Sequence, residues 1–168
     1  MKKVAVVYWS GTGNTEQMAK AFCEGINLGG ASCDVYKANE FNAEMMDDYD
    51  SVAFGCPSMG VEELEEEEFL PMFEACEERL MGKEIALFGS YGWGDGEWMR
   101  IWEKRCLQMG ASVINESVIC NESPDSETIE KCKKSRRKIS EDLKYKDMKK
   151  RYGRLKIVAF FLFKIYVI

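Results

Sequence analysis

The 168-residue sequence contains no histidine, which excludes imidazole-based catalytic triads, proton relays and histidine zinc sites. It contains seven cysteines, an odd number, and no C-x-x-C pair. This pattern indicates neither a disulfide framework nor a metal knuckle. Basic residues are in the minority, with 23 Lys and Arg against 29 Asp and Glu, which argues against a partner nucleic acid. No signal-peptide pattern precedes the first predicted strand. We therefore expect a cytoplasmic protein with reduced thiols.

Charge is unevenly distributed along the chain. Residues 144–168 contain eight basic residues and one acidic residue, a net charge of +7, whereas residues 1–143 carry -13. The length suits one domain, and a hydrophobic content of 46% is sufficient to fill its core. We therefore expect one domain over residues 1–143, followed by a basic and apolar tail over residues 144–168.

The expected tail ends in an apolar stretch, 157–168, which Lys164 interrupts and which is too short to span a bilayer as a helix. A basic segment beside an apolar one can instead lie on an anionic membrane surface. The tail could also add a strand or helix to the domain, mediate self-association or have no function. The sequence leaves these alternatives open, with membrane contact not the favoured one.

Short apolar runs alternate with segments of helical spacing before the tail. The predicted strands are 4–8, 33–36, 52–54, 85–88 and 118–120. Apolar residues at helical spacing predict the helices between them: Met18, Phe22 and Ile26; Phe69, Phe73, Cys76 and Leu80; Trp98, Ile101, Trp102 and Met109. A last helix is predicted to begin at Ser123 as N-cap. This alternation predicts an α/β fold, a doubly wound parallel sheet between two helical layers.

The loop Ser10–Thr15, with sequence SGTGNT, follows the first predicted strand and precedes a predicted helix; we call it the phosphate loop. Its two glycines let successive N–H groups point inward, and its three hydroxyl side chains add donors at the helix N-terminus. No basic residue occurs between Val4 and Met18, which excludes a P-loop with its lysine. Neutral donors alone predict a cradle for the phosphate of a mononucleotide cofactor.

Two further loops follow the third and fourth predicted strands. These are 55–62, GCPSMGVE, and 89–96, GSYGWGDG. The second loop is rich in glycine and so has few side chains that could bury Tyr91 and Trp93. Large aromatic side chains at the carboxyl ends of strands are candidates for stacking on a planar ligand.

The segments YWSGTGNT (8–15), MGVE (59–62) and GSYGWGDG (89–96) together resemble those of short-chain flavodoxins. The resemblance covers about residues 1–143 and places three separate motifs in the right order. It implies a five-stranded, flavodoxin-like three-layer sandwich with strand order 2-1-3-4-5 and FMN at the switch point, which is the established pattern of flavodoxin itself.

The resemblance also implies roles for individual residues. The phosphate loop would hold the FMN phosphate, Met59 and Trp93 would cover the two faces of the isoalloxazine, and Tyr91 would lie nearby. The Gly60–Val61 peptide would lie at flavin N5, and Glu62 would bind the pyrimidine edge. The candidate FMN-binding residues are Ser10, Gly11, Thr12, Gly13, Asn14, Thr15, Ser58, Met59, Gly60, Val61, Glu62, Ser90, Tyr91, Gly92, Trp93 and Gly94.

Two positions depart from the family pattern. Pro57 stands where relatives have a phosphate-binding serine, and Ser58 is the candidate substitute. Val61 follows Gly60 where relatives have an acidic or polar residue, and a β-branched residue resists positive φ. We expect the turn to place positive φ on Gly60 rather than Val61, which would favour the turn suited to one-electron-reduced flavin.

The function that the resemblance implies is low-potential transfer of single electrons between redox proteins by a monomer that is not an enzyme. The site offers no cation to a negatively charged reduced flavin, and burial beside the acidic run 62–68 would lower its potential. That run suits both a solvated helix start and a docking surface for basic partners. The alternatives are an FMN-dependent NAD(P)H reductase, which a stacked Trp93 would block, and a flavin-free protein-binding module.

Overall fold

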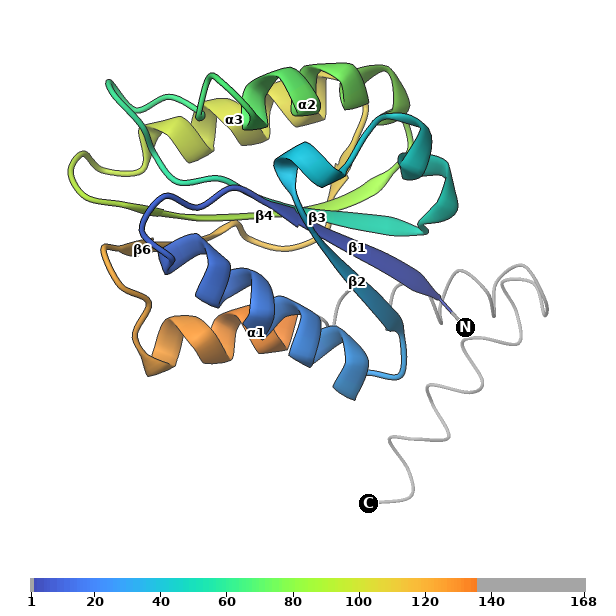
Figure 1. Cartoon of the computed structure of the whole chain (residues 1–168), viewed down its shortest axis with the longest axis horizontal. Helices are drawn as coiled ribbons and strands as arrows, with labels where there is room; N and C mark the ends of the chain where they lie inside the picture. The colour runs from blue at the N-terminus through green and yellow to red at the C-terminus, as the bar shows by residue number, and fades with distance from the viewer. Residues whose placement is uncertain (1, 136–168) are drawn as a thin grey trace, which may run out of the picture.

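The computed structural model describes residues 2–135, in which strands and helices alternate (Figure 1). The strands are β1 (Lys3–Tyr8), β2 (Ser32–Lys37), β3 (Ser51–Gly55), β4 (Glu84–Tyr91), β5 (Ser112–Val113) and β6 (Val118–Asn121). The helices are α1 (Asn14–Leu28), α2 (Phe69–Cys76), α3 (Glu97–Gln108) and a last helix over 126–135, with 3-10 turns η1 (Ala38–Glu40), η2 (Glu44–Asp48) and η3 (Glu77–Arg79). The expected boundary at residue 143 and the tail 144–168 lie outside the described residues.

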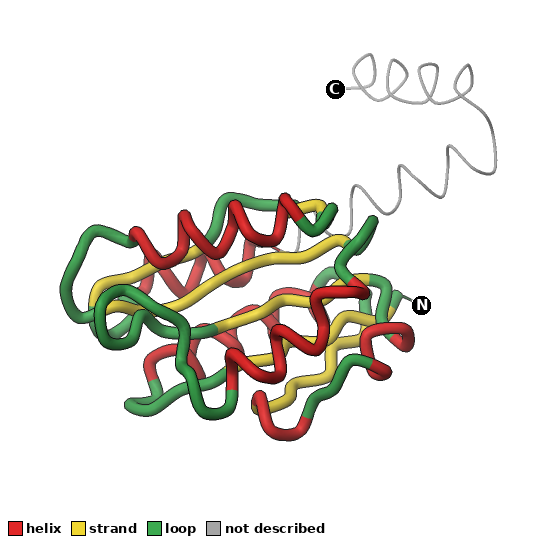
Figure 2. The backbone as a smooth tube through the Cα atoms, turned by 90° about the horizontal axis from the view of Figure 1, so that it is seen from above, coloured by secondary structure: helices red, strands yellow, loops and turns green. Residues whose placement is uncertain are grey.

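The strands form one parallel sheet in the order β2-β1-β3-β4-β5, and β6 also pairs with β4. One face of this sheet is covered by α1 and the last helix, and the other by α2 and α3 (Figures 1 and 2). The predicted doubly wound sheet and its strand order are therefore confirmed. Because the strands are parallel, the loops that follow β1, β3 and β4 meet at one edge of the sheet, which we call the rim.

The central strands are buried on both faces, as their continuous apolar sequences predict. In β1, Ala5 and Val7 pack into the core under α2 and α3, whereas Val4 and Val6 pack into the core under α1. All four side chains are fully buried. The period of two in strand side chains thus divides one short sequence between two cores and fixes the sheet in the middle of three layers.

The fifth strand is formed by two segments rather than the single run predicted at 118–120. From Ile85 to Phe88, β4 advances three residues, whereas the paired residues Val113 and Val118 are five apart. Two extra residues therefore interrupt the pairing, and the strand bulges between β5 and β6. The predicted run corresponds to β6, while β5 is too short to give a sequence signal.

The buried face of α3 differs from the one predicted. Trp98, Trp102 and Cys106 are buried at intervals of four residues, as a core-facing helix requires. Ile101 and Met109 were predicted to belong to the same face, but they are 58% and 39% exposed. Helical spacing alone did not distinguish the centre of the face from its edge.

The predicted N-cap of the last helix was also wrong. The helix begins at residue 126, and the Asp125 carboxylate accepts the Thr128 N–H at 2.8 Å. Ser123 lies before this cap, and its hydroxyl donates to the side-chain oxygen of Asn14 at 3.2 Å. Asp125, two residues later, therefore serves as the N-cap in place of Ser123. None of the helices in residues 2–135 is both long and apolar enough to cross a membrane.

Candidate functional site

The phosphate loop is braced by its own side chains and by glycine. Gly13 has φ +89°, a left-handed conformation that lets the chain turn directly into α1. Its N–H donates to the Ser10 hydroxyl oxygen at 3.0 Å, and its carbonyl accepts the Gln17 N–H at 3.0 Å. The first N–H groups of α1 therefore lie at the rim, where a helix N-terminus favours an anion.

Hydrogen bonds connect the three rim loops. The hydroxyls of Thr15 and Ser90 are 3.3 Å apart, which joins the start of α1 to the end of β4. The Ser58 N–H donates to the Ser90 carbonyl at 2.9 Å, which joins the loop after β3 to the same strand end. Ser90 is thus the common support of the rim, which the sequence did not indicate.

A cavity of about 430 Å³ lies between these loops. Its lining includes eight of the predicted cofactor-binding residues: Gly11, Thr12, Asn14, Ser58, Met59, Ser90, Tyr91 and Gly92. Trp9, Pro57 and Glu122 also line it and were not predicted. Trp9 and Glu122 directly follow β1 and β6, so the rule that ligands bind beyond strand carboxyl ends could have identified both.

The other predicted residues lie around this cavity rather than in its wall. Three of them belong to the phosphate loop and stabilise it through their hydrogen bonds: Ser10, Gly13 and Thr15. The side chain of Trp93 is 60% exposed beside the cavity-lining Gly92. The remaining members belong to the loops at its edge: Gly60, Val61, Glu62 and Gly94.

Residues 59–63 form a small hairpin, which we call the 60s hairpin. Met59 and Glu63 exchange two backbone hydrogen bonds, of 2.8 and 2.9 Å. Positive φ falls on Gly60 (48°) and Glu62 (54°) and not on Val61, as the β-branched side chain requires. Val61 is 80% exposed at the tip.

The Glu62 carboxylate holds the 60s hairpin against the loop after β4. One oxygen accepts the N–H groups of Asp95 and Gly96 at 3.0 and 3.2 Å. A Cβ on Gly94 would stand 1.8 Å from that oxygen and displace the carboxylate, and the φ of +88° at this position also favours glycine. The carboxylate that the resemblance assigns to the flavin therefore also connects two rim loops.

The acidic run 62–68 does not behave as one surface. Glu65 is buried, and its carboxylate accepts three N–H groups, those of Glu67, Glu68 and Phe69, at 2.8–3.0 Å. It therefore caps the start of α2, which is the structural role expected of acids at a helix N-terminus. Glu63 and Glu66 to Glu68 are exposed.

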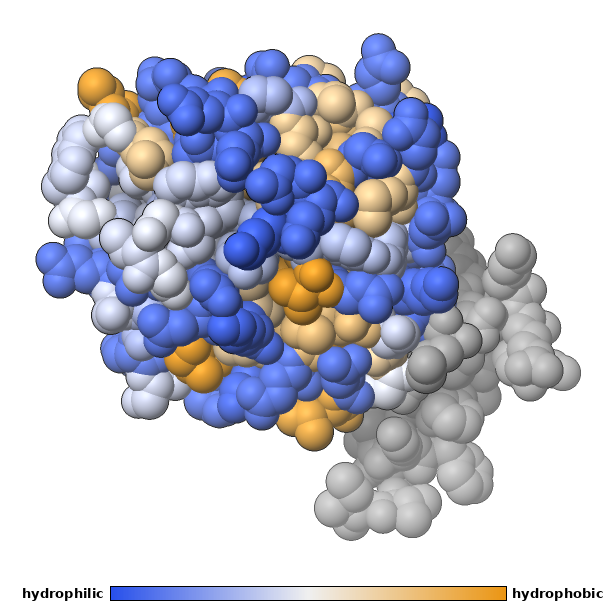
Figure 3. All heavy atoms as spheres, viewed as in Figure 1, coloured by the Kyte–Doolittle hydropathy of each residue, from blue (hydrophilic) through white to orange (hydrophobic). Residues whose placement is uncertain are grey.

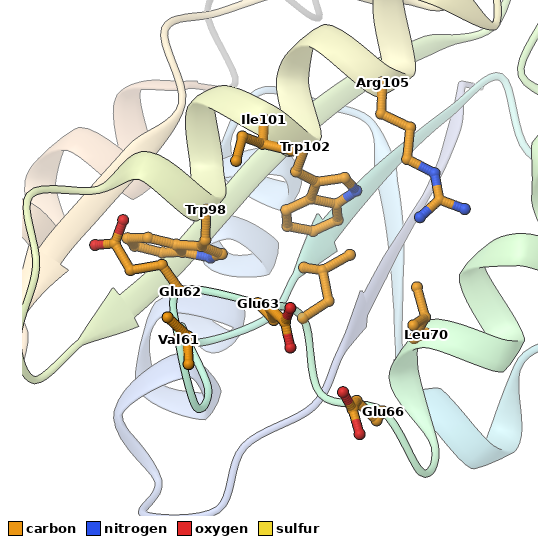
Figure 4. Close-up of a pocket in the computed structure, with 10 residues that line it drawn as sticks. Val61, Glu62, Glu63, Glu66, Leu70, Trp98, Ile101, Trp102 and Arg105 are labelled. Carbon is orange, nitrogen blue, oxygen red and sulfur yellow. The ribbon is translucent and has the colours of Figure 1, made fainter.

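A second cavity, of about 360 Å³, lies between the 60s hairpin and α3; we call it the α3 groove (Figure 4). Leu64, Leu70, Ile101 and Trp102 give it apolar walls, and Glu62, Glu63 and Glu66 stand around it. The Trp102 indole nitrogen is buried and has no hydrogen-bond partner among the described residues. Arg105 at one end is already paired with Glu74 and Glu77.

Cys56 lies beneath the rim, and its thiol is buried and unreactive. Burial raises the pKa of its thiol above the ordinary range, and its sulfur accepts the Glu65 N–H at 3.4 Å. Its carbonyl accepts the Trp98 indole N–H at 3.3 Å. Cys56 therefore links the loop after β3 to the segment that precedes α2 and to α3. No group of metal-ligating side chains occurs in residues 2–135.

The sheet, the phosphate loop and the adjoining cavity define a doubly wound protein that binds a phosphorylated ligand beyond its strand ends. The chain belongs to the flavodoxin family, whose model matches residues 6–135. It is 43% identical to the flavodoxin of Megasphaera elsdenii over 123 residues, 73% of this chain and 89% of that one. It is also 43% identical to the flavodoxin of Clostridium beijerinckii over 120 residues, 71% of this chain and 87% of the relative.

Solved structures agree with these sequence relationships. The solution structure of two-electron reduced M. elsdenii flavodoxin superimposes with a TM-score of 0.75 at 40% identity, covering 82% of this chain and 98% of that one. A flavodoxin from the domain Archaea gives a TM-score of 0.74 at 26% identity and covers 84% and 99%. The resemblance to short-chain flavodoxins is confirmed: this is an FMN-binding carrier that transfers electrons to redox partner proteins and is not an enzyme. Neither the reductase nor the flavin-free module is favoured.

Proposed function

We propose that FMN binds in the 430 Å³ cavity, with its phosphate at the phosphate loop and its ring system between Met59 and Trp93. The observation that carries this assignment is the joining of three rim loops, through Ser90, around a cavity at the N-terminus of α1. Met59 and Trp93 are large apolar side chains that are 38% and 60% exposed, and a planar ring between them would cover both. The residues present therefore fit the cofactor.

When bound, FMN supplies the chemistry of the protein by accepting and releasing one electron at a time. The chain's contribution is to bind and orient it with donors that carry no charge, namely the N–H groups and hydroxyls of the phosphate loop. Acids rather than cations surround the ring-binding side, because Glu62 and Glu63 belong to the 60s hairpin. These acids disfavour added negative charge, so we expect a low reduction potential.

The assignment of the phosphate is tested by comparing FMN with riboflavin, which lacks that group. Thr12→Val removes a cavity-lining hydroxyl, and it should weaken FMN binding about fivefold, the effect of roughly 1 kcal/mol for one hydrogen bond, without changing riboflavin binding. Ser117→Ala is the matched control, because that hydroxyl lies away from the cavity and bonds Glu103. Fluorescence titration gives both constants. Equal losses for the two ligands would reject this placement, and no uptake of FMN by wild-type protein would reject the function.

The redox partners should dock with a basic surface on the side of the α3 groove. Glu63 and Glu66 are exposed beside its apolar walls, whereas Arg105 is already neutralised by two glutamates. A partner that presents lysine or arginine around an apolar side chain would complement both features. Electrostatic steering would also bring that partner to the 60s hairpin, which adjoins the cofactor cavity.

Reduction of cytochrome c, a basic redox protein, provides the test of docking. Replacement of Glu63 and Glu66 by glutamine should slow electron transfer from FMN-loaded, reduced protein about tenfold at low salt and make the rate less salt-dependent. Glu130→Gln, an exposed change on the last helix, is the matched control and should leave the rate unchanged. A wild-type rate that does not fall with ionic strength would contradict this docking surface.

The remaining expectations concern the whole chain. We propose a cytoplasmic monomer whose FMN-binding domain is residues 1–143, and the face in Figure 3 supports the monomer because its hydrophobic residues are scattered among hydrophilic ones. Removal of residues 144–168 should leave FMN affinity and a monomeric elution volume unchanged. Co-sedimentation of the full and shortened chains with anionic vesicles tests membrane contact by the tail. Loss of FMN binding on truncation would contradict the domain boundary.

A further inference from the structure

Two of the seven cysteines differ from the rest in exposure. Cys23, on α1, and Cys33, on β2, are half-buried, whereas the other five are buried. Both belong to the margin of the core between α1 and the sheet. The order β2-β1-β3-β4-β5 makes β2 an edge strand, so this margin adjoins solvent.

The two cysteines are neighbours in space. The Cys23 sulfur is 3.8 Å from the carbonyl oxygen of Cys33. Asn27 connects the same pair, because its amide nitrogen donates to the Cys23 sulfur at 3.5 Å and its oxygen accepts the Cys33 N–H at 3.2 Å. Burial and then the adjacent Cys23 thiol raise the pKa of Cys33 above its ordinary range.

We propose that Cys23 and Cys33 form a reversible disulfide that ties α1 to the edge strand β2. With hydrogen peroxide as oxidant, the Cys23 thiolate attacks one peroxide oxygen and becomes a sulfenic acid, and the released hydroxide takes up the thiol proton as water. Cys33 then attacks the sulfenic sulfur, forming the S–S bond as the S–O bond breaks, and its proton leaves with that oxygen in a second water. The two thiols lose two electrons and two protons, and one peroxide is reduced.

The groups around Cys23 and Cys33 indicate which thiol attacks the peroxide and which resolves the sulfenic acid. The Asn27 side-chain N–H donates to the Cys23 sulfur, which fixes that sulfur at the half-buried margin of the core, and we assign the first attack to Cys23. Cys33 keeps its proton longer because its pKa is raised, so it acts as the resolving thiol. Burial raises the pKa of every other cysteine and withdraws it from solvent: Cys56, Cys76, Cys106, Cys120 and Cys132.

The sequence makes this proposal easy to test, because cleavage after Lys20 and Lys37 releases the peptide 21–37, which contains both cysteines and no other. FMN-loaded full-length protein is treated with a small excess of peroxide, alkylated, unfolded, alkylated again with a heavier reagent, and digested. We expect peptide 21–37 to be lighter by two hydrogen atoms and unlabelled. Dithiothreitol should restore two labelled thiols. The five buried cysteines are internal controls and should carry the heavier label.

Single substitutions test the order of the steps. In Cys33→Ser, dimedone should trap a sulfenic acid at Cys23, whereas in Cys23→Ser it should label Cys33 at least tenfold less. Peroxide should raise the urea midpoint of wild-type unfolding but leave both variants unchanged, because a cross-link restricts the unfolded chain. Full alkylation of peptide 21–37 after peroxide treatment would overturn the proposal. So would independent oxidation of both cysteines to sulfinic acid, and both results can be read from wild-type protein alone.

Discussion

The phosphate loop and the segment 59–69 lie at the same rim but are held in opposite ways. The phosphate loop is held by uncharged groups, such as the Ser10 hydroxyl that accepts the Gly13 N–H and the Ser90 hydroxyl that bonds the Thr15 hydroxyl. The segment 59–69 is held by carboxylates: Glu62 reaches backbone groups 33 and 34 residues away, and Glu65 caps α2. Neutral groups leave the positive end of α1 free for an anion, whereas the carboxylates of Glu62 and Glu65 are stabilised by the backbone N–H groups that donate to them.

The largest effect expected from this comparison is loss of the Glu65 carboxylate. Glu65→Ala leaves three N–H groups without their acceptor at a buried helix start, so the free energy of unfolding should fall by about 2–3 kcal/mol. Urea denaturation monitored by circular dichroism measures it. Glu66→Ala is the control, because Glu66 is the exposed neighbour and should change stability by less than about 0.5 kcal/mol. Equal effects would show that the acidic run acts as a single charged surface.

The phosphate loop should instead depend on backbone conformation. Gly13→Ala meets no atom within 4 Å but must hold φ +89°, which should lower the free energy of unfolding by about 1–2 kcal/mol. Gly92→Ala also meets no atom within 4 Å and needs no positive φ, so it should be neutral or slightly stabilising. Measuring both in protein without FMN separates strain from ligand contact. If the two variants were equally stable, the left-handed turn would not be what fixes this loop.

The sequence predicted those parts of the molecule that leave a local pattern in the chain. The strands 4–8, 52–54 and 85–88 follow from runs of apolar residues, and the phosphate loop follows from glycines and hydroxyls before a helix. The buried role of Glu65 could not be distinguished from that of its exposed neighbours, because six acids in seven positions give no pattern. Which acid turns inward depends on where α2 packs against the sheet.

The long-range contacts of the rim were also beyond the sequence. Ser90 supports both other loops through a hydroxyl and a carbonyl, and neither contact has a local signature. Glu122, by contrast, directly follows β6, so the rule that ligands bind beyond strand ends could have identified it. Ser123 lost its predicted capping role to Asp125 because either could cap, and only the packed start of the last helix decided between them.

The tip of the 60s hairpin allows a smaller effect to be predicted, on reduction potential rather than stability. Val61→Gly makes positive φ accessible at position 61 and so favours the alternative turn of the oxidised protein. The potential for the first electron should become more negative by a few tens of millivolts, since about 1 kcal/mol corresponds to roughly 40 mV. Val61→Ala is the matched control, because alanine still resists positive φ while removing the branched side chain. A potential that is unchanged or more positive in Val61→Gly, measured with redox dyes, would contradict this role.

The smallest effect is expected at Asp125, two residues after Ser123, whose hydroxyl bonds Asn14 of the phosphate loop. The Thr128 backbone N–H and then its hydroxyl hold the pKa of Asp125 below its ordinary range. A lowered pKa in the folded state stabilises the protein above the unfolded value of about 4, and this stabilisation is lost as the pH falls through the folded value. Asp125→Asn keeps a capping side chain but no charge, so wild type should be slightly more stable at pH 6, and the difference should disappear as the pH falls well below about 4. A difference in urea midpoint that stays constant over this range would mean that the cap works without its charge, and that support beside the phosphate loop is neutral throughout.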